Sequence, residues 1–177
     1  MRVIIVGGGE IARKMALRLS GEKKDVVVIE KDPEKAESLA KQLDALVIHG
    51  DGTEKEILMD ADAEKCDVFF AISDDDKTNL LAAGAAKALG IEAVVAAANR
   101  PENENAFRKA GVKVVSIADC IAKALQDAAA SGDVPEPPDE KPKKGGNGIL
   151  EKVRKSIAPR KKKAATRHGR KKGLKRK

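Results

Sequence analysis

Short, continuous apolar runs rich in valine and isoleucine alternate along the chain with longer segments whose apolar residues recur at helical spacing. Runs of this length and composition are typical of strands that are buried on both faces. We predict strands at Arg2–Val6, Val26–Ile29, Ala45–Ile48, Val68–Ile72, Ala93–Ala97 and Lys113–Ser116. We predict helices at Ile11–Leu19, Pro33–Leu43, Asp75–Leu89, Pro101–Ala110 and Ile117–Ala130, with a shorter one near Glu54–Asp60.

Proline and glycine positions support these boundaries. Pro33 and Pro101 fall in the first turns of predicted helices, where a missing N–H costs nothing. Gly90 and Gly111 fall where helices should end. Strands that alternate with helices through short turns imply right-handed crossovers and a parallel sheet. We therefore predict an α/β fold, a Rossmann-like doubly wound parallel sheet in the order 3-2-1-4-5-6.

Charge is distributed unevenly along the chain, whose formal net charge is +7. Residues 134–177 hold 17 Lys and Arg but 4 Asp and Glu, a balance of +13, which leaves −6 for the preceding residues. We predict a folded domain at residues 1–133, followed at residues 134–177 by a Pro/Gly linker and a basic, mostly disordered tail. This asymmetry suggests a polyanionic partner for the tail alone.

Within the tail, Ile149, Leu150, Val153 and Ile157 recur at helical spacing among lysine and arginine residues. Such a short stretch is too brief to be a stable helix alone but can fold on a surface. Three interpretations of the tail stay open. It is a solvated polycation without a specific partner, or a segment that binds anionic lipid, or one that binds nucleic acid.

Cysteine and aromatic content argue against several protein classes. Cys66 and Cys120 cannot build a disulfide framework, and neither has metal-type spacing, so we expect reduced thiols and no metal site. The sequence has no signal-peptide pattern, and no apolar run approaches the roughly 20 residues that span a bilayer. We therefore expect a soluble, intracellular protein. The absence of Trp and Tyr argues against a base-stacking surface in the folded domain.

The first candidate site is a glycine-rich loop directly after the first strand. The run Gly7-Gly8-Gly9-Glu10-Ile11-Ala12 satisfies Gly-x-Gly-x-x-Ala, an accepted form of the dinucleotide-binding fingerprint. Gly7 permits the tight turn, Gly9 lets a pyrophosphate approach the backbone, and Ala12 keeps helix and strand close. The following helix offers free N–H groups and a partial positive charge to the anion. The competing interpretation is an ordinary glycine-rich turn of an α/β protein.

An acidic residue at the end of the second strand fits the same kind of site. Glu30 lies 21 residues beyond Gly9, where a carboxylate can accept hydrogen bonds from a ribose diol. A carboxylate there repels a 2′-phosphate and so favours NAD(H) over NADP(H). The alternative is that Glu30 is a solvated charge in the run Glu30-Lys31-Asp32, and Lys31 itself is either a ligand contact or simply exposed.

Two more strand ends should line the same crevice, because ligands of open α/β sheets bind beyond the carboxyl ends of the strands. Asp51 and Gly52 follow the third strand, and Ser73 follows the fourth. We predict that Asp51 holds the adenosine end and that Ser73 and Asn79 contact the phosphates or the nicotinamide side. Structural roles compete with each prediction: Asp51 as a turn or cap residue, and Ser73 or Asp75 as a helix N-cap.

Catalytic chemistry is poorly represented in the chain. His49 lies in a turn at a strand end and His168 in the basic tail, and neither has a neighbour that suggests acid–base work. An oxidoreductase would also need a substrate domain, which a tail of this composition cannot supply. We therefore predict a binding module without catalytic residues. The alternative is a small NAD(P)-dependent oxidoreductase-like or redox-sensing protein whose tail binds nucleic acid.

Taken in order, five segments form a recognisable series: Val3–Gly9, Val27–Pro33, Val47–Thr53, Asp76–Leu81 and Asn99–Glu102. The series resembles the nucleotide-binding domain of the Trk potassium-uptake regulatory subunit, TrkA, and of the wider regulator-of-potassium-conductance (RCK) group. The run Phe107–Val112 continues the match, so the resemblance covers residues 1 to about 130. The Gly-Asp-x-Thr turn and the Asp-x-x-Asn-Leu run make it far more specific than a lone glycine motif.

The resemblance implies a cytoplasmic ligand sensor, peripheral to the inner face of the membrane. It would form a homodimer or higher homo-oligomer and bind a potassium transporter or channel subunit. Its ligand would be NAD(H), or ATP and ADP as in some relatives, and binding would gate the partner through a conformational change. By matching position, the nucleotide contacts fall at the glycine loop and the strand ends already named, Gly7, Gly9, Glu30, Asp51, Ser73 and Asn79.

The sequence departs from the family pattern at two cationic positions and at its C-terminal end. Glu10 and Ala97 stand where relatives often carry arginine, so a triphosphate would be poorly neutralised here. Binding of NAD would be weakened less by the loss of these arginines, because helix and backbone dipoles can hold its pyrophosphate. Where many relatives continue into a small C-terminal domain, this sequence continues into the basic tail.

Overall fold

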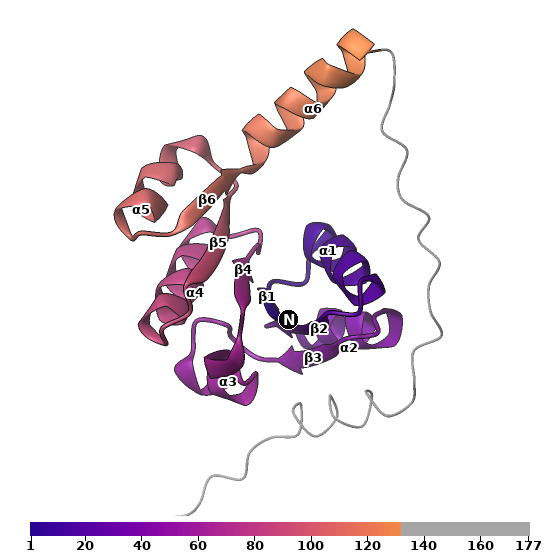
Figure 1. Ribbon diagram of the computed structural model, residues 1–177, viewed down its shortest axis with the longest axis vertical. Helices are drawn as coiled ribbons and strands as arrows, with labels where there is room; N and C mark the ends of the chain where they lie inside the picture. The colour runs from indigo at the N-terminus through magenta and orange to yellow at the C-terminus, as the bar shows by residue number, and fades with distance from the viewer. Residues whose placement is uncertain (132–177) are drawn as a thin grey trace, which may run out of the picture.

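The computed structural model describes residues 1–131, and the predicted boundary at residue 133 and the tail lie outside this part. A single parallel sheet runs through it, with the strand order β3-β2-β1-β4-β5-β6 (Figure 1). This order confirms the predicted doubly wound fold. The strands are β1 (Arg2–Val6), β2 (Asp25–Glu30), β3 (Leu46–His49), β4 (Val68–Ala71), β5 (Ala93–Ala98) and β6 (Lys113–Ser116).

The helices follow the strands in the predicted sequence. They are α1 (Glu10–Gly21), α2 (Pro33–Gln42), α3 (Lys55–Asp60), α4 (Asp76–Ala88), α5 (Glu104–Lys109) and α6 (Ile117–Ser131), with short 3-10 helices at Ala63–Lys65 and Pro101–Asn103. Gly90 (φ +86°) and Gly111 (φ +69°) adopt the left-handed conformation just after α4 and α5, which confirms both as helix stops. Among residues 1–131, no helix is long and apolar enough to cross a membrane.

Alternating side chains of β1 supply two separate cores, one on each face of the sheet. Val3 and Ile5 pack in one core with residues of α1 and α2, while Ile4 and Val6 pack in the other with residues of α3, α4 and α5. Alanines on α1 and α4 let these helices approach the strands closely. The central strands are therefore anchored from both sides, which fixes where their carboxyl ends lie.

Two details differ from the sequence-based predictions. Strand β6 is not buried on both faces: it lies at the sheet edge, and Val115 is 41% exposed. The helix that follows it, α6, has no buried residue and extends away from the sheet (Figure 1), so it does not cover that face. The predicted helix at Pro101–Ala110 is divided into a 3-10 turn and α5, and Asp76 accepts hydrogen bonds from the Arg100 N–H and the Asn103 side chain at the 3-10 turn.

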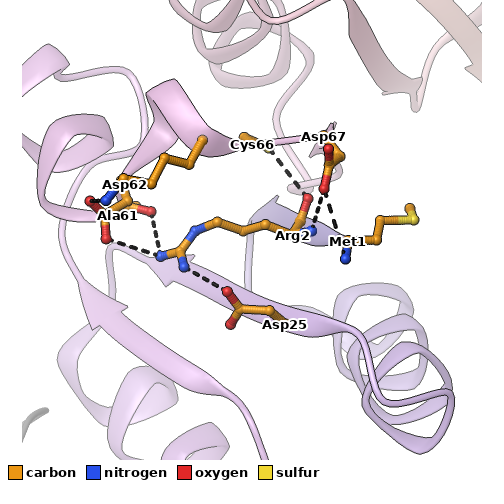
Figure 2. Close-up of polar contacts among 8 residues, drawn as sticks. Met1, Arg2, Asp25, Ala61, Asp62, Cys66 and Asp67 are labelled. Carbon is orange, nitrogen blue, oxygen red and sulfur yellow. Dashed lines mark hydrogen bonds and ion pairs between the residues drawn. The ribbon is translucent and has the colours of Figure 1, made fainter.

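The amino ends of the strands carry a polar cluster centred on Arg2 (Figure 2). The Arg2 guanidinium donates to Asp25 Oδ2 at 2.6 Å, to the Ala61 carbonyl at 3.0 Å and to Asp62 Oδ2 at 3.4 Å. The Arg2 backbone N–H donates to Asp67 Oδ2 at 2.6 Å. This cluster, called the amino edge below, ties β1 to the start of β2 and to the segment that precedes β4.

Candidate functional site

A crevice of about 500 Å³ lies at the opposite edge, beyond the carboxyl ends of β1 to β4. It is lined by the loop after β1, the residues at the end of β2, the turn after β3 and the segment between β4 and α4. The strand order reverses between β1 and β4, which is where ligands of doubly wound sheets bind. The crevice is therefore the candidate site.

The three loop glycines meet different demands. Gly7 has φ +112°, and a Cβ there would lie 2.8 Å from the Ser73 Cα and N atoms. A Cβ on Gly8 would collide with the Glu30 carboxylate and with Leu39. A Cβ on Gly9 would meet nothing within 4 Å, so this residue opens onto free space in the crevice wall. The geometry matches a turn that brings bare backbone to a ligand.

The N-terminus of α1 carries no side-chain cap. Its N-cap residue is Gly9, whereas α2 and α4 are capped by Asp32 and Asp75, whose carboxylates accept hydrogen bonds from first-turn N–H groups. The first-turn donors of α1 are thus left without a carboxylate or hydroxyl of their own. A helix end of this kind is suited to a phosphate group.

The other predicted residues of this loop have mixed positions. Ala12 is fully buried in the core with α2, as its predicted packing role requires. Ile11 is 50% exposed and is not part of the crevice wall. Glu10 also lies outside the wall, where it pairs with Arg13 at 3.0 Å, and this contact lowers the pKa of Glu10. The Arg13 charge is therefore compensated by Glu10 rather than directed at the glycine loop.

Glu30 is held at the end of β2 against the glycine loop. Its side chain is largely buried, and Oε1 accepts a hydrogen bond from the Asp32 N–H at 2.7 Å. Its Oε2 accepts no hydrogen bond from residues 1–131, and it is the atom that a Cβ on Gly8 would strike. One carboxylate oxygen is therefore fixed by the backbone while the other is available to a hydroxyl group.

Asp51 is both a turn residue and part of the crevice wall. Its Oδ1 accepts hydrogen bonds from the Thr53 N–H at 3.0 Å and from the Thr53 hydroxyl at 2.7 Å, which is the structural role that competed with ligand contact. Its Oδ2 pairs with Lys31 Nζ at 2.7 Å. Mainly because of Lys31, the pKa of Asp51 is lowered to about 2. Gly52 packs so closely on Val6 that a Cβ would collide with it.

The ion pair between Lys31 and Asp51 bridges the ends of β2 and β3 and was not predicted from the sequence. Both residues were singled out, but as separate ligand contacts. The available signal was the adjacency of the two strands, in which Glu30 is paired with His49. His49 completes this corner, since its Nε2 lies 3.0 Å from the Lys31 carbonyl oxygen.

At the end of β4, Ser73 lies in the crevice wall and Asn79 lies behind it. Asn79 is fully buried, and its Oδ1 accepts from the Ser73 N–H at 2.7 Å and from the Ser73 hydroxyl at 2.8 Å. Its Nδ2 donates to the carbonyls of Ser73 and Ala97. Asn79 thus positions Ser73, and only Ser73 reaches the crevice.

The acidic run after Ser73 holds two structural residues. Asp75 is the N-cap of α4, as the sequence allowed, and accepts from the Thr78 N–H at 2.9 Å. Asp76 accepts from the Asn99 and Arg100 N–H groups and from the Asn103 side chain, a role that sequence reasoning missed. Among residues 1–131, no group of His, Cys, Asp and Glu side chains is arranged to hold a metal ion.

Known structures with this architecture include nucleotide-binding domains. The chain is similar to the NAD(P)-binding domain of an exopolyphosphatase-related protein from Archaeoglobus fulgidus, with a TM-score of 0.66, 22% identity, and coverage of 73% of this chain and 97% of that one. It is also similar to the GsuK channel bound to NAD, with a TM-score of 0.59, 22% identity, and coverage of 64% and 21%. These likenesses support the fold.

Sequence comparison identifies the family. The chain is 36% identical over 112 residues to a Trk system potassium uptake protein TrkA homolog from Methanothermobacter thermautotrophicus, which covers 63% of this chain and 52% of that protein. The chain thus spans about half the length of this relative. The profile of the TrkA-N domain matches residues 3–118, which include the whole crevice wall and every strand residue except Arg2. The chain therefore belongs to the TrkA-N domain family.

Proposed function

We propose that the crevice binds NAD(H), and that the domain acts as a nucleotide-sensing regulatory module rather than as an enzyme. The observation that carries this proposal is the uncapped N-terminus of α1 beside the open face of Gly9. A pyrophosphate accepted there would be held by first-turn N–H groups and the helix dipole. Glu30, with one free carboxylate oxygen, would accept a hydrogen bond from the adenosine ribose.

The charges in the crevice wall favour a dinucleotide over ATP. Its two cations, Lys31 and Lys35, both come from the segment after β2, and Lys31 is paired with Asp51. The glycine loop thus has no cation beside it in the crevice wall. Backbone N–H groups alone would have to neutralise the charge of a triphosphate at this loop. The diester pyrophosphate of NAD carries less charge, so we expect NAD to bind more tightly than ATP. ADP remains a weaker alternative ligand.

Binding without catalysis is supported by the position of the imidazole and thiol side chains. His49, Cys66 and Cys120, which are the His and Cys residues of the described part, all lie outside the crevice wall. Burial is the main reason that the pKa of the Cys66 thiol is raised, which suppresses its reactive thiolate form. The wall therefore offers positioning groups but no imidazole or thiol.

A role in potassium transport is proposed from the relatives. One is named as a Trk system potassium uptake protein, and one structural neighbour is the GsuK channel bound to NAD. We propose that this chain forms a homo-oligomer at the cytoplasmic face of a membrane potassium transporter or channel subunit. Binding of the nucleotide would shift the oligomer between conformations and so gate the partner. The basic tail would add contacts to anionic lipid.

The test is a titration of the full chain with NAD⁺, NADH, NADPH, ADP and ATP, read by calorimetry and by thermal stability. NAD(H) is expected to bind more tightly than ATP, and at 100 times its Kd to stabilise the fold by about 2.7 kcal/mol. Glu30→Gln should reduce the preference for NADH over NADPH. Failure of every nucleotide to bind, or unchanged discrimination in Glu30→Gln, would contradict the ligand assignment.

The proposed partner is tested separately by affinity purification from membranes of the source cell. A potassium transporter or channel subunit is expected to co-purify, and its transport activity should respond to NAD⁺ or NADH when the two are reconstituted together. Recovery of the full chain without any such subunit would refute the transport role while leaving the ligand assignment standing.

A further inference from the structure

The crevice wall is strongly asymmetric in charge. Five carboxylates and two lysines contribute to it, and both lysines come from the segment after β2. On the far side of the glycine loop, the segment between β4 and α4 and the first turn of α4 contribute acidic and hydroxyl side chains to the crevice wall but no cation. The residues on that side are Ser73, Asp74, Asp75 and Thr78.

The two carboxylates on that side differ in what they bind. Asp75 is committed to the helix cap, since it accepts from the Thr78 N–H at 2.9 Å and the Thr78 hydroxyl at 2.6 Å. These bonds lower its pKa and keep it ionised. Asp74 is exposed and makes no hydrogen bond or ion pair with any residue of the described chain. Asp74 therefore lines the crevice without an ion-pair partner among residues 1–131, although Lys77 and Arg100 line an adjoining cavity that Asp74 also lines.

The proposed function determines which end of the ligand this carboxylate meets. With the adenosine ribose at Glu30 and the pyrophosphate at Gly9, a dinucleotide that crosses the crevice places its second nucleoside on the β4 side. In NAD⁺ that nucleoside carries a cationic nicotinamide ring, and in NADH the ring is neutral. We propose that Asp74 makes this domain selective for the oxidised dinucleotide, NAD⁺, over NADH. This inference rests on the proposed function.

The selectivity has a simple electrostatic origin. The adenosine, pyrophosphate and ribose groups are the same in both forms, so their contacts cancel when the two affinities are compared. The ring charge does not cancel, and it interacts favourably with the Asp74 carboxylate, whereas the Asp75 carboxylate is already bound by the Thr78 N–H and hydroxyl groups. Because Asp74 is exposed to water, the expected preference is modest, about fivefold for a charge pair at close range.

The experiment compares three ligands on the full chain at low ionic strength: NAD⁺, NADH and ADP-ribose, which lacks the ring. Asp74→Asn removes the charge at an exposed side chain that makes no hydrogen bond or ion pair with residues 1–131. Asp44→Asn is the matched control, because Asp44 is also exposed, makes no hydrogen bond or ion pair with residues 1–131 and lies outside the crevice. Both variants change the net charge of the protein by the same amount, so a general charge effect appears in both.

We expect the wild-type chain and Asp44→Asn to bind NAD⁺ about fivefold more tightly than NADH. In Asp74→Asn the affinity for NAD⁺ should fall until the two forms bind nearly equally, with ADP-ribose and NADH little changed or slightly tighter. Added salt should erode the wild-type preference. Equal binding of NAD⁺ and NADH by the wild type, or a preference that survives in Asp74→Asn, would overturn the selectivity alone. Failure of all three ligands would overturn the proposed function as well.

Discussion

The two edges of the sheet carry similar side chains but use them in opposite ways. At the amino edge, Nη1 and Nη2 of the Arg2 guanidinium donate to the carboxylates of Asp25 and Asp62 and to the Ala61 carbonyl (Figure 2), and its buried Nε alone has no partner among residues 1–131. The carboxyl ends of β1 to β4 and the crevice wall beyond them form the opposite side, called the carboxyl edge. There the N-terminus of α1 has no side-chain cap, Gly9 opens onto free space, and Asp74 makes no hydrogen bond or ion pair with residues 1–131. Polar groups that satisfy one another stabilise a fold, whereas polar groups left unsatisfied around a crevice are available to a ligand.

This comparison predicts that variants at the amino edge will change the free energy of unfolding, whereas variants at the crevice surface will change mainly the affinity for nucleotide. The largest effect is expected for Gly7→Ala, because the residue needs φ +112° and a Cβ would press on the Ser73 backbone at 2.8 Å. We expect a loss of about 2–4 kcal/mol in the free energy of unfolding and no measurable nucleotide binding. Urea denaturation and calorimetric titration measure the two quantities.

Gly9→Ala is the matched control for this variant. Its φ of −71° suits alanine, and nothing lies within 4 Å of the added methyl group. The free energy of unfolding should change by no more than about 1 kcal/mol, while binding weakens at least tenfold (about 1.4 kcal/mol) because the methyl group occupies the approach to the α1 N-terminus. Equal loss of stability in both variants would refute the distinct roles given to the two glycines.

The next largest effect is expected at Asn79, which lies behind the crevice wall and positions Ser73 there. Asn79→Ala removes four hydrogen bonds from a fully buried side chain and leaves the Ser73 N–H without its acceptor. We expect the free energy of unfolding to fall by about 2–3 kcal/mol. Nucleotide affinity should fall only modestly, because Asn79 acts through Ser73. If Ser73→Ala retained affinity while Asn79→Ala lost it, direct contact by Asn79 would replace this explanation.

The sequence predicted those features that depend on local pattern. Strand positions follow from continuous apolar runs, and the uncapped glycine turn follows from Gly7 and Gly9 alone. The features that were missed depend on loops that meet only in the folded chain. Lys31 pairs with Asp51 across 20 positions, and Asp76 binds Asn99 across 23. The exposure of β6 was also missed, since a four-residue segment with two central valines does not reveal whether a later helix covers it.

The amino edge offers the reciprocal test. Arg2→Met keeps the apolar stem but removes the guanidinium, which leaves the Ala61 carbonyl without its donor. Because Asp25 and Asp62 are largely exposed, the expected loss is about 1–2 kcal/mol in the free energy of unfolding. The Kd for nucleotide should stay unchanged in calorimetric titration. A weaker Kd in a fully folded Arg2→Met protein would show that the two edges are coupled, contrary to the comparison.

The smallest effect on stability is expected at the ion pair between Lys31 and Asp51. This pair lies in the crevice wall, yet its two charges satisfy each other as the groups at the amino edge do. Lys31 is the main reason that the pKa of Asp51 is about 2, against 3.8 for an ordinary aspartate. A carboxyl whose pKa is lowered on folding stabilises the native state above its unfolded pKa, and this stabilisation is lost as pH falls from about 4 toward 2.

Lys31→Met should therefore raise the Asp51 pKa and flatten the pH dependence of stability in that window. Carboxyl NMR titration of Asp51 measures the shift directly, and an unchanged pKa in Lys31→Met would mean that Thr53, rather than Lys31, controls this carboxylate.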